Sequence, residues 1–122
     1  MTGLSSQPTS DELLELPITH HPINTAQRIE GQVPATTGFQ QLSTLGEAEI
    51  GVWEMSPGAL QDIEADEYFA VLRGRGQLQI LAEDGTVAQD FTLTAGTSLR
   101  LTAGMRTRWT VAETLRKIYF TL

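Results

Sequence analysis

The sequence predicts an all-β sandwich or barrel, and three observations support this prediction. Short runs rich in β-branched and aromatic residues recur from about residue 37 onward, at intervals of about 8 to 12 residues. Glycine-containing turn sequences separate the runs, and no segment requires a helix longer than about two turns. The runs are GFQQLSTL (38–45), AEIGVWEM (48–55), EYFAVLRG (67–74), GQLQILAEDG (76–85), TVAQDFTL (86–93), TSLRLTAG (97–104), RTRWTV (106–111) and RKIYFTL (116–122).

The turn sequences mark the expected corners between these runs. Asp84-Gly85 is the clearest hairpin signal, because Asp-Gly readily adopts the positive φ angles of a two-residue turn. Further corners are expected at SPG (56–58), RGRG (73–76) and TAG (94–96 and 102–104). Closing such strands into a barrel would remove the exposed edges that a flat sheet leaves.

The N-terminal part of the chain lacks the regular β pattern. Residues 1–17 are expected to form a flexible tail, in which Ser-Asp at 10–11 could cap one helical turn before a proline ends it. Residues 18–36 carry prolines and no sustained periodicity, so we expect an extended arm that lies on the barrel or on a neighbouring subunit. The barrel itself is expected over residues 37–122.

Composition and charge exclude several classes of protein and site. The 122 residues fit one domain and include no cysteine, which excludes disulfides, thiolate metal sites and cysteine nucleophiles. A net charge of -7 repels phosphate backbones and anionic lipid heads, so we expect neither a nucleic-acid nor a membrane partner. No segment approaches the roughly 18 uninterrupted apolar residues of a membrane span, and we expect a cytoplasmic protein.

Several pieces of the sequence resemble a known family in both order and spacing. The pieces are GVWEM, DEYFAVLRGRG and AGMRTRWTV, within residues 38–122. They are similar to small cupins, and in particular to the subfamily that includes ureidoglycine aminohydrolase-like and ethanolamine-utilisation-type cupins. The resemblance implies a double-stranded β-helix, the jelly-roll barrel of RmlC-like proteins, with an extended N-terminal arm. It also implies a homodimer formed through the arm and the barrel strands.

The resemblance implies a metal site whose ligands are mostly replaced in this chain. Cupins hold a divalent metal with two histidines and a glutamate from one motif and a histidine from a second. Glu67 and Gly74 reproduce the end of the first motif, but its histidine positions fall within LQDI at residues 60–63. In the second motif Gly96 and Gly104 remain, while Thr102, Thr107 and Val111 replace the proline, histidine and asparagine.

The remaining donors are too few for a first-row metal, which needs three or four converging ligands. We therefore expect no metal and no other cofactor. A weak metal recruited by Gln61 or Asp62 remains an alternative. His20 and His21 lie in the arm, outside both motifs, and are expected at the surface or in an interface.

Strand alternation and the resemblance together predict the side chains of the barrel cavity. Glu67 and Phe69 share one face of their strand, and Thr107, at a former histidine position, shares its face with Trp109. The resemblance also places the tryptophan of GVWEM on the cavity face. We expect Glu67 as the catalytic or anchoring group, and as ligand-binding residues Trp53, Gln61, Phe69, Thr107 and Trp109. The alternative is that the rings simply fill a small barrel.

Glu67 decides between the possible functions, because a carboxylate among aromatic rings is costly without a partner. It must meet a positive ligand or a hydrogen-bonding partner, or become a neutral acid. The first case predicts a metal-free cupin that binds a small polar metabolite, such as an amine or a ureide, through charge and cation–π attraction. The last predicts a hydrolase-like or lyase-like enzyme with Glu67 as acid or base. A third hypothesis is a non-catalytic dimeric assembly module.

Overall fold

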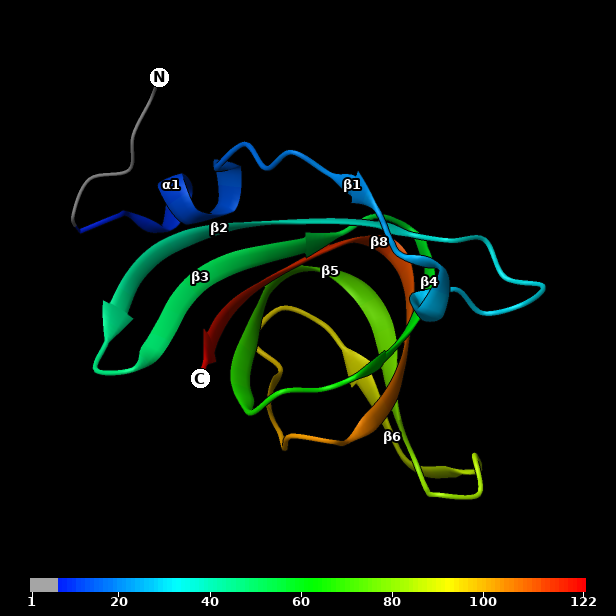
Figure 1. Cartoon of the computed structure of the whole chain (residues 1–122). Coiled ribbons are helices and arrows are strands. Elements are labelled where there is room, and N and C mark those ends of the chain that lie inside the picture. Colours follow the sequence, from blue (N-terminus) through cyan, green and yellow to red (C-terminus); the bar gives the residue numbers. More distant parts are fainter. Residues whose placement is uncertain (1–6) are drawn as a thin grey trace.

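Strands dominate the computed structural model, which describes residues 7–122 (Figure 1). In chain order the elements are α1 (Ser10–Glu15), β1 (His21–Pro22), η1, a 3-10 helix (Thr25–Gln27), β2 (Thr36–Leu45), β3 (Ala48–Met55), β4 (Gly58–Ile63), β5 (Glu67–Leu81), β6 (Val87–Leu93), β7 (Ser98–Leu101) and β8 (Arg106–Thr121). The predicted all-β fold is confirmed.

The eight strands in the described part of the chain form one antiparallel sheet that curves into a barrel. Hydrogen-bonded neighbours follow the order β1-β2-β3-β8-β5-β6, while β4 pairs with β8 and β7 pairs with β5. The long strand β8 joins two walls, because its C-terminal half pairs with β3 and its N-terminal half with β4. Figure 1 shows β5 and β8 curving around the barrel, with β2 and β3 continuing beyond it on one side.

A bend inside β5 corrects the corner predicted at residues 73–76. The RGRG sequence does not end the strand, because pairing with β8 becomes irregular between Val71 and Gly76 and then continues. Gly74 lies at the bend with φ of +102°, and a Cβ atom there would come within 2.2 Å of the backbone oxygen of Thr114. Only glycine fits this position, and the bulged strand turns without a loop.

Three further features of the strands and turns differ from the prediction. The runs at 106–111 and 116–122 are one strand, β8, and the predicted runs do not include β4. The hairpin turn between β5 and β6 spans residues 82–86 instead of two residues. Asp84 accepts bonds from the backbone N–H and hydroxyl of Thr86, which accounts for the longer turn.

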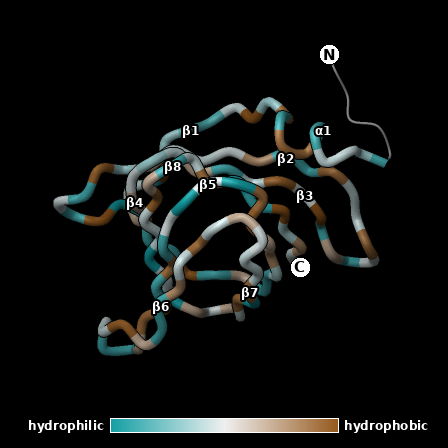
Figure 2. Tube along the Cα trace, turned by 180° about the vertical axis from the view of Figure 1, so that it is seen from behind, coloured by the Kyte–Doolittle hydropathy of each residue, from teal (hydrophilic) through white to brown (hydrophobic). Residues whose placement is uncertain are grey.

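The core follows the period of two that the strands impose. In β5, Phe69 and Val71 are buried while Tyr68, between Glu67 and Phe69, is exposed. In β8, Trp109 is buried and Thr110 is exposed. Apolar and polar segments accordingly succeed one another along the trace in Figure 2. The buried cluster joins β3, β4, β5, β6, β7 and β8 with Ile23 of the arm.

The helix α1 lies against the outside of the sheet and is held there by a buried arginine. Its N-cap is Thr9, which forms a capping box with Glu12, one residue before the predicted cap. The Arg116 guanidinium donates to the backbone oxygens of Leu13 (2.8 Å) and Leu16 (2.6 Å). These bonds satisfy carbonyl groups at the C-terminal end of the helix.

The same arginine belongs to an ion cluster that fixes the start of the arm. Arg116 Nε lies 2.8 Å from Glu54 Oε2, and His20 Nε2 lies 2.8 Å from Glu54 Oε1. Burial alone would raise the pKa of Glu54, but the hydrogen bonds from His20 and Arg116 outweigh it and hold the pKa below the usual value. His20 therefore has a structural partner, while the adjacent His21 is exposed.

The arm lies along its own barrel. β1 pairs antiparallel with the first residues of β2, and Pro34 forms a bridge with Ala59 of β4. The amide of Gln61 donates to the backbone oxygens of Ala26 (3.3 Å) and Arg28 (3.2 Å), which holds η1 beside β4. The boundaries predicted for tail, arm and barrel stay predictions, and residues 1–6 of the tail lie outside the described residues. No helix within residues 7–122 is both long and apolar enough to cross a membrane.

Candidate ligand pocket

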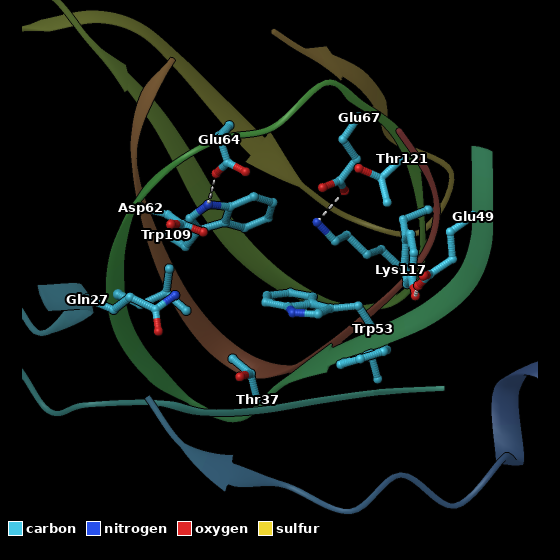
Figure 3. A pocket seen from close by; sticks show the side chains of 13 residues that line it. Gln27, Thr37, Glu49, Trp53, Asp62, Glu64, Glu67, Trp109, Lys117 and Thr121 are labelled. Carbon is cyan, nitrogen blue, oxygen red and sulfur yellow. Dashed lines mark hydrogen bonds and ion pairs between the residues drawn. The ribbon is translucent and has the colours of Figure 1, made fainter. Parts of the chain in front are cut away.

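A cavity of about 240 Å³ opens on the inner face of the barrel. Its walls come from β2, β3, β4, β5, β8 and η1, and Figure 3 shows their polar side chains directed toward one space. The strand register places side chains of neighbouring strands side by side in this wall. Phe39 of β2 is paired with Trp53 of β3, which in turn is paired with Lys117 of β8. The volume lies below the roughly 300–1,000 Å³ of drug-sized sites, so it suits a small molecule.

Lys117 is the central cation of the pocket. Its Nζ atom lies 4.5 Å from the ring centroids of Trp53, Phe69 and Trp109. The ammonium also donates to Glu67 Oε2 at 2.6 Å (Figure 3), and the lysine side chain is only 5% exposed. A carboxylate and three ring faces thus surround one buried charge.

The ammonium of Lys117 is the partner that a carboxylate among aromatic rings requires. The expected pocket held a single carboxylate and no cation, whereas the structure supplies a cation from β8 of the same chain. Glu67 is therefore a paired carboxylate with no need for an external positive ligand or a bound proton. Since Lys117 already fills the space between the rings, the same rings do not form an open cage for a ligand.

Glu64 is the most enclosed acid of the pocket. Its Oε2 accepts the hydroxyl of Thr107 at 2.6 Å and the indole N–H of Trp109 at 3.2 Å. Burial raises the pKa of Glu64 above its usual value, against the opposing effects of the Thr107 hydroxyl and the Lys117 charge. Burial thus favours the neutral form of Glu64.

Asp62 is the second acid with a raised pKa, and it lies two positions before Glu64. Burial is the main cause, opposed by a hydrogen bond from the backbone N–H of Ile63 and by the charge of Lys117. Asp62 also raises the pKa of Glu64 through like-charge repulsion. Gln27 of η1 hydrogen-bonds to Asp62, so the arm contributes to the pocket as well as covering it.

A third carboxylate, Glu49 of β3, stands at the opposite side of the pocket in Figure 3. It accepts the hydroxyl of Tyr119. Burial raises the pKa of Tyr119, and the bond to Glu49 raises it further, so the phenol stays neutral. With Lys117 balancing Glu67, the acids Glu49, Asp62 and Glu64 leave the pocket with an excess of hydrogen-bond acceptors.

The side chains present do not fit the metal site of metal-binding cupins. Within residues 7–122 no three histidine, aspartate or glutamate side chains converge closely enough to hold an ion. The remaining motif ligand, Glu67, is directed at an ammonium 2.6 Å away, which would repel a metal cation at the same oxygen.

The structure brings some of the predicted site residues together and separates others. Trp53, Trp109 and Glu67 line the cavity. Phe69 is fully buried beneath it, where it contacts Lys117 and Trp109. The remaining two do not line the cavity: Thr107 lies behind Glu64 and Gln61 faces η1. The roles proposed for these residues in catalysis or binding stay predictions.

Several polar residues of the pocket were not predicted, among them Glu49, Glu64, Lys117 and Tyr119, and Asp62 was considered only as a weak metal ligand. Alternation carried a signal for all of these, because Glu49 shares the face of Trp53 on its strand and the others fall into two further segments. Leu60, Asp62 and Glu64 share one face of a strand, and Lys117 shares its face with Tyr119. Neither segment was assigned a face from the sequence, because its strand partners were unknown.

Comparisons with known proteins bear on the same part of the chain. A family model described as the EutQ-like cupin domain matches residues 42–119, more than half of the chain. No curated protein matches the sequence of this chain.

Similar solved structures support the fold. A Rhizobium leguminosarum protein of unknown function is 24% identical, with a TM-score of 0.60 over 70% of this chain and 79% of that one. The Clostridium difficile EutQ protein is 22% identical, with a TM-score of 0.54 over 71% of this chain, which spans 62% of its length. A putative ethanolamine utilization protein Q from Salmonella typhimurium is 16% identical, with a TM-score of 0.56 over 86% and 94% of the two chains.

Proposed function

Because the chain belongs to the EutQ-like cupin family, we propose that its barrel pocket binds a small neutral or cationic metabolite rich in N–H donors, such as an amine or a ureide. One observation carries the proposal: three acidic side chains besides the Lys117–Glu67 ion pair line the same cavity of about 240 Å³. They are Glu49, Asp62 and Glu64.

The charge of the pocket selects among ligand classes. Hydrogen bonds to charged groups contribute about 1.5 to 3 kcal/mol each, and the acids offer free acceptor positions beyond their internal bonds. An anionic ligand would meet like charges in a partly buried space, which costs free energy. The polar anchor therefore shifts from Glu67 to Glu64 and Asp62, while Trp53 and Trp109 supply the apolar walls.

Calorimetry with a defined panel tests the proposal. The panel contains small primary amines, including the ethanolamine that the name of the Salmonella protein mentions, N-alkylureas, and small dicarboxylates as the anionic arm. We expect an amine or urea to bind and the dicarboxylates to give no heat. Glu64→Gln should weaken binding at least about tenfold, the equivalent of one charged hydrogen bond.

Glu83→Gln is the matched control, because Glu83 is exposed in the turn between β5 and β6 and should bind like the wild type. The proposal fails if no amine or urea binds the wild type. It also fails if Glu64→Gln and Glu83→Gln bind equally well.

A second candidate function is hydrolase-like or lyase-like catalysis, and the raised pKa of Glu64 favours it. A proton donor needs a pKa near the working pH, and Glu64 lies in the pocket without the ammonium partner that Glu67 has. We propose Glu64 as the acid in this case. Carbon-detected NMR titration of Glu64 distinguishes the candidates, because a carboxyl that titrates at its usual pKa would contradict this activity.

Homodimer formation through the arm and barrel strands remains part of the proposal, as does a cytoplasmic location. An exposed apolar side chain at the end of β2 supports a dimer, since Leu45 is 70% exposed and does not line the pocket. A non-catalytic assembly module would use the same surface and leave the pocket without a ligand, so the calorimetric panel also separates these two functions.

A further inference from the structure

The three rings around Lys117 form a closed box with one charged wall. Trp53 comes from β3, Phe69 from β5 and Trp109 from β8, so three different strands each present one ring to the same point. The rings also contact one another: the ring centroid of Trp109 lies 5.5 Å from that of Trp53 and 5.5 Å from that of Phe69. Glu67 closes the box at 2.6 Å from Nζ (Figure 3).

The chemistry of these walls selects an ammonium group. Ring faces offer negative π density but no lone pairs, so they attract a cation that keeps its own hydrogens and give a metal no ligand. Glu67 supplies the single strong acceptor that one N–H of a primary ammonium needs. A buried cation without these partners would be expensive, which indicates that the box and the ammonium stabilise one another.

We propose that the box formed by Trp53, Phe69, Trp109 and Glu67 is a primary-ammonium binding site that the chain fills with its own Lys117. The barrel thus carries a tethered organic cation beside the one remaining metal-motif carboxylate, in place of a metal. The inference goes beyond the proposed function, because it concerns the wall of the pocket and holds whichever metabolite the pocket accepts.

A tethered ligand can be replaced by a free one of the same shape. Lys117→Ala removes Cγ, Cδ, Cε and Nζ, and n-propylammonium contains the same four heavy atoms. Lys117 lines the open pocket, so a small molecule has a path to the vacated box. A ligand that binds only the folded state raises the unfolding temperature with its concentration, by mass action.

Thermal unfolding of Lys117→Ala in propylammonium chloride tests the proposal. We expect the variant to melt below the wild type, and its Tm to rise with propylammonium and saturate. Neutral 1-propanol at the same concentration, and sodium chloride at the same ionic strength, should not reproduce the rise. Wild type should respond less than Lys117→Ala, because its box is filled and only the neighbouring pocket is open to an amine. Lys117→Ala combined with Glu67→Gln should lose most of the extra response.

Several outcomes would overturn the proposal. One is an equal effect of propylammonium and 1-propanol on Lys117→Ala, and another is an equal effect of propylammonium on wild type. If Lys117→Ala does not fold in buffer, it is refolded in propylammonium or in 1-propanol, and failure in both contradicts the site. Calorimetry of wild type with Mn²⁺ and Zn²⁺ should show no stoichiometric binding at Glu67. If wild type binds one of these metals and Glu67→Gln does not, the metal occupies the place assigned to the tethered cation and the proposal is contradicted. These tests depend on the difference between Lys117→Ala and wild type, whereas the proposed function concerns binding by wild type, so failure of this proposal leaves the proposed function standing.

Discussion

At the scale of single residues, the surroundings of each carboxyl group set its role. Glu67 meets an ammonium and Glu54 meets an arginine and a histidine, so both have charged partners. Glu64 accepts only neutral donors, a hydroxyl and an indole N–H, and is buried. The same side-chain type therefore serves as an ion-pair partner in two places and as a buried acid with a raised pKa in a third.

The raised pKa of Glu64 predicts a pH-dependent effect of Glu64→Gln on stability. Because the folded pKa lies above the unfolded one, wild type loses stability as pH rises from the ordinary glutamate pKa through the folded value, and the penalty is complete above it. Glutamine cannot ionise and still accepts the bonds from Thr107 and Trp109. Urea unfolding should show Glu64→Gln more stable than wild type at pH 8, with the gain shrinking toward pH 4. A variant that is less stable than wild type at pH 8 contradicts this account.

Single-residue orientation could be predicted where alternation and the cupin resemblance agreed, and not elsewhere. Trp53 and Trp109 line the cavity. The pairing of Lys117 with Glu67 could not be predicted, because it depends on the alignment of two strands about 50 residues apart. The register of the strands determines which side chains meet when they lie so far apart in the sequence. A one-residue slip would have moved Lys117 to the other face of the sheet.

At the scale of elements, the bend of β5 lets one strand serve two walls of the barrel. The irregular pairing with β8 is confined to residues 71–76, and regular pairing holds on both sides of it. The first half of β5 carries Glu67 and Phe69 to the pocket, while the second half pairs with β6. Without the bend these two functions would require separate strands joined by a loop, as the RGRG sequence had indicated.

Alanine substitutions at two glycines test the importance of this bend. Gly74 and Gly85 both have positive φ angles, +102° and +86°, but only at Gly74 would a Cβ atom meet backbone, 2.2 Å away. Gly85→Ala should cost about 1 to 2 kcal/mol from the left-handed conformation alone. Gly74→Ala should cost clearly more, at least about 3 kcal/mol, because strain and a backbone clash add. Urea unfolding measures both, and equal losses would show that the bend tolerates a side chain.

Element existence was easier to predict than element boundaries. Alternating apolar runs identified the sheet strands from 38 onward, apart from β4, whose sequence GALQDI carries polar residues toward the cavity. That departure from a simple apolar face coincides with the pocket, which Asp62 and Glu64 line. The two halves of β5 were predicted as separate strands because glycine weakens a strand, and here it only bends one.

At the scale of the whole molecule, the arm and helix α1 are held to the barrel by polar contacts. Arg116 holds α1, His20 reaches Glu54, and Gln61 holds η1. Beyond the first residues of β2, where β1 pairs, the outer edge of β2 has no strand partner within the described chain. An open edge with exposed apolar side chains is a surface that a second copy would cover.

Deletion of residues 1–34 tests the predicted homodimer. We expect the full chain to have the mass of a dimer by light scattering, and the deletion to lower it toward that of a monomer. Circular dichroism serves as the control, because the barrel strands should remain folded. A monomeric full chain contradicts the dimer, and an unchanged dimer after deletion shows that the arm is not the joint.

The central claim concerns the charge at the middle of the barrel, and one measurement addresses it directly. Lys117 is the only lysine of the sequence, so a lysine-labelled sample gives a single side-chain ammonium signal in NMR. The account predicts Lys117 resonances shifted upfield by ring currents, with nuclear Overhauser contacts to Trp53, Phe69 and Trp109. A signal at the position of free lysine, without contacts to any ring, would contradict it.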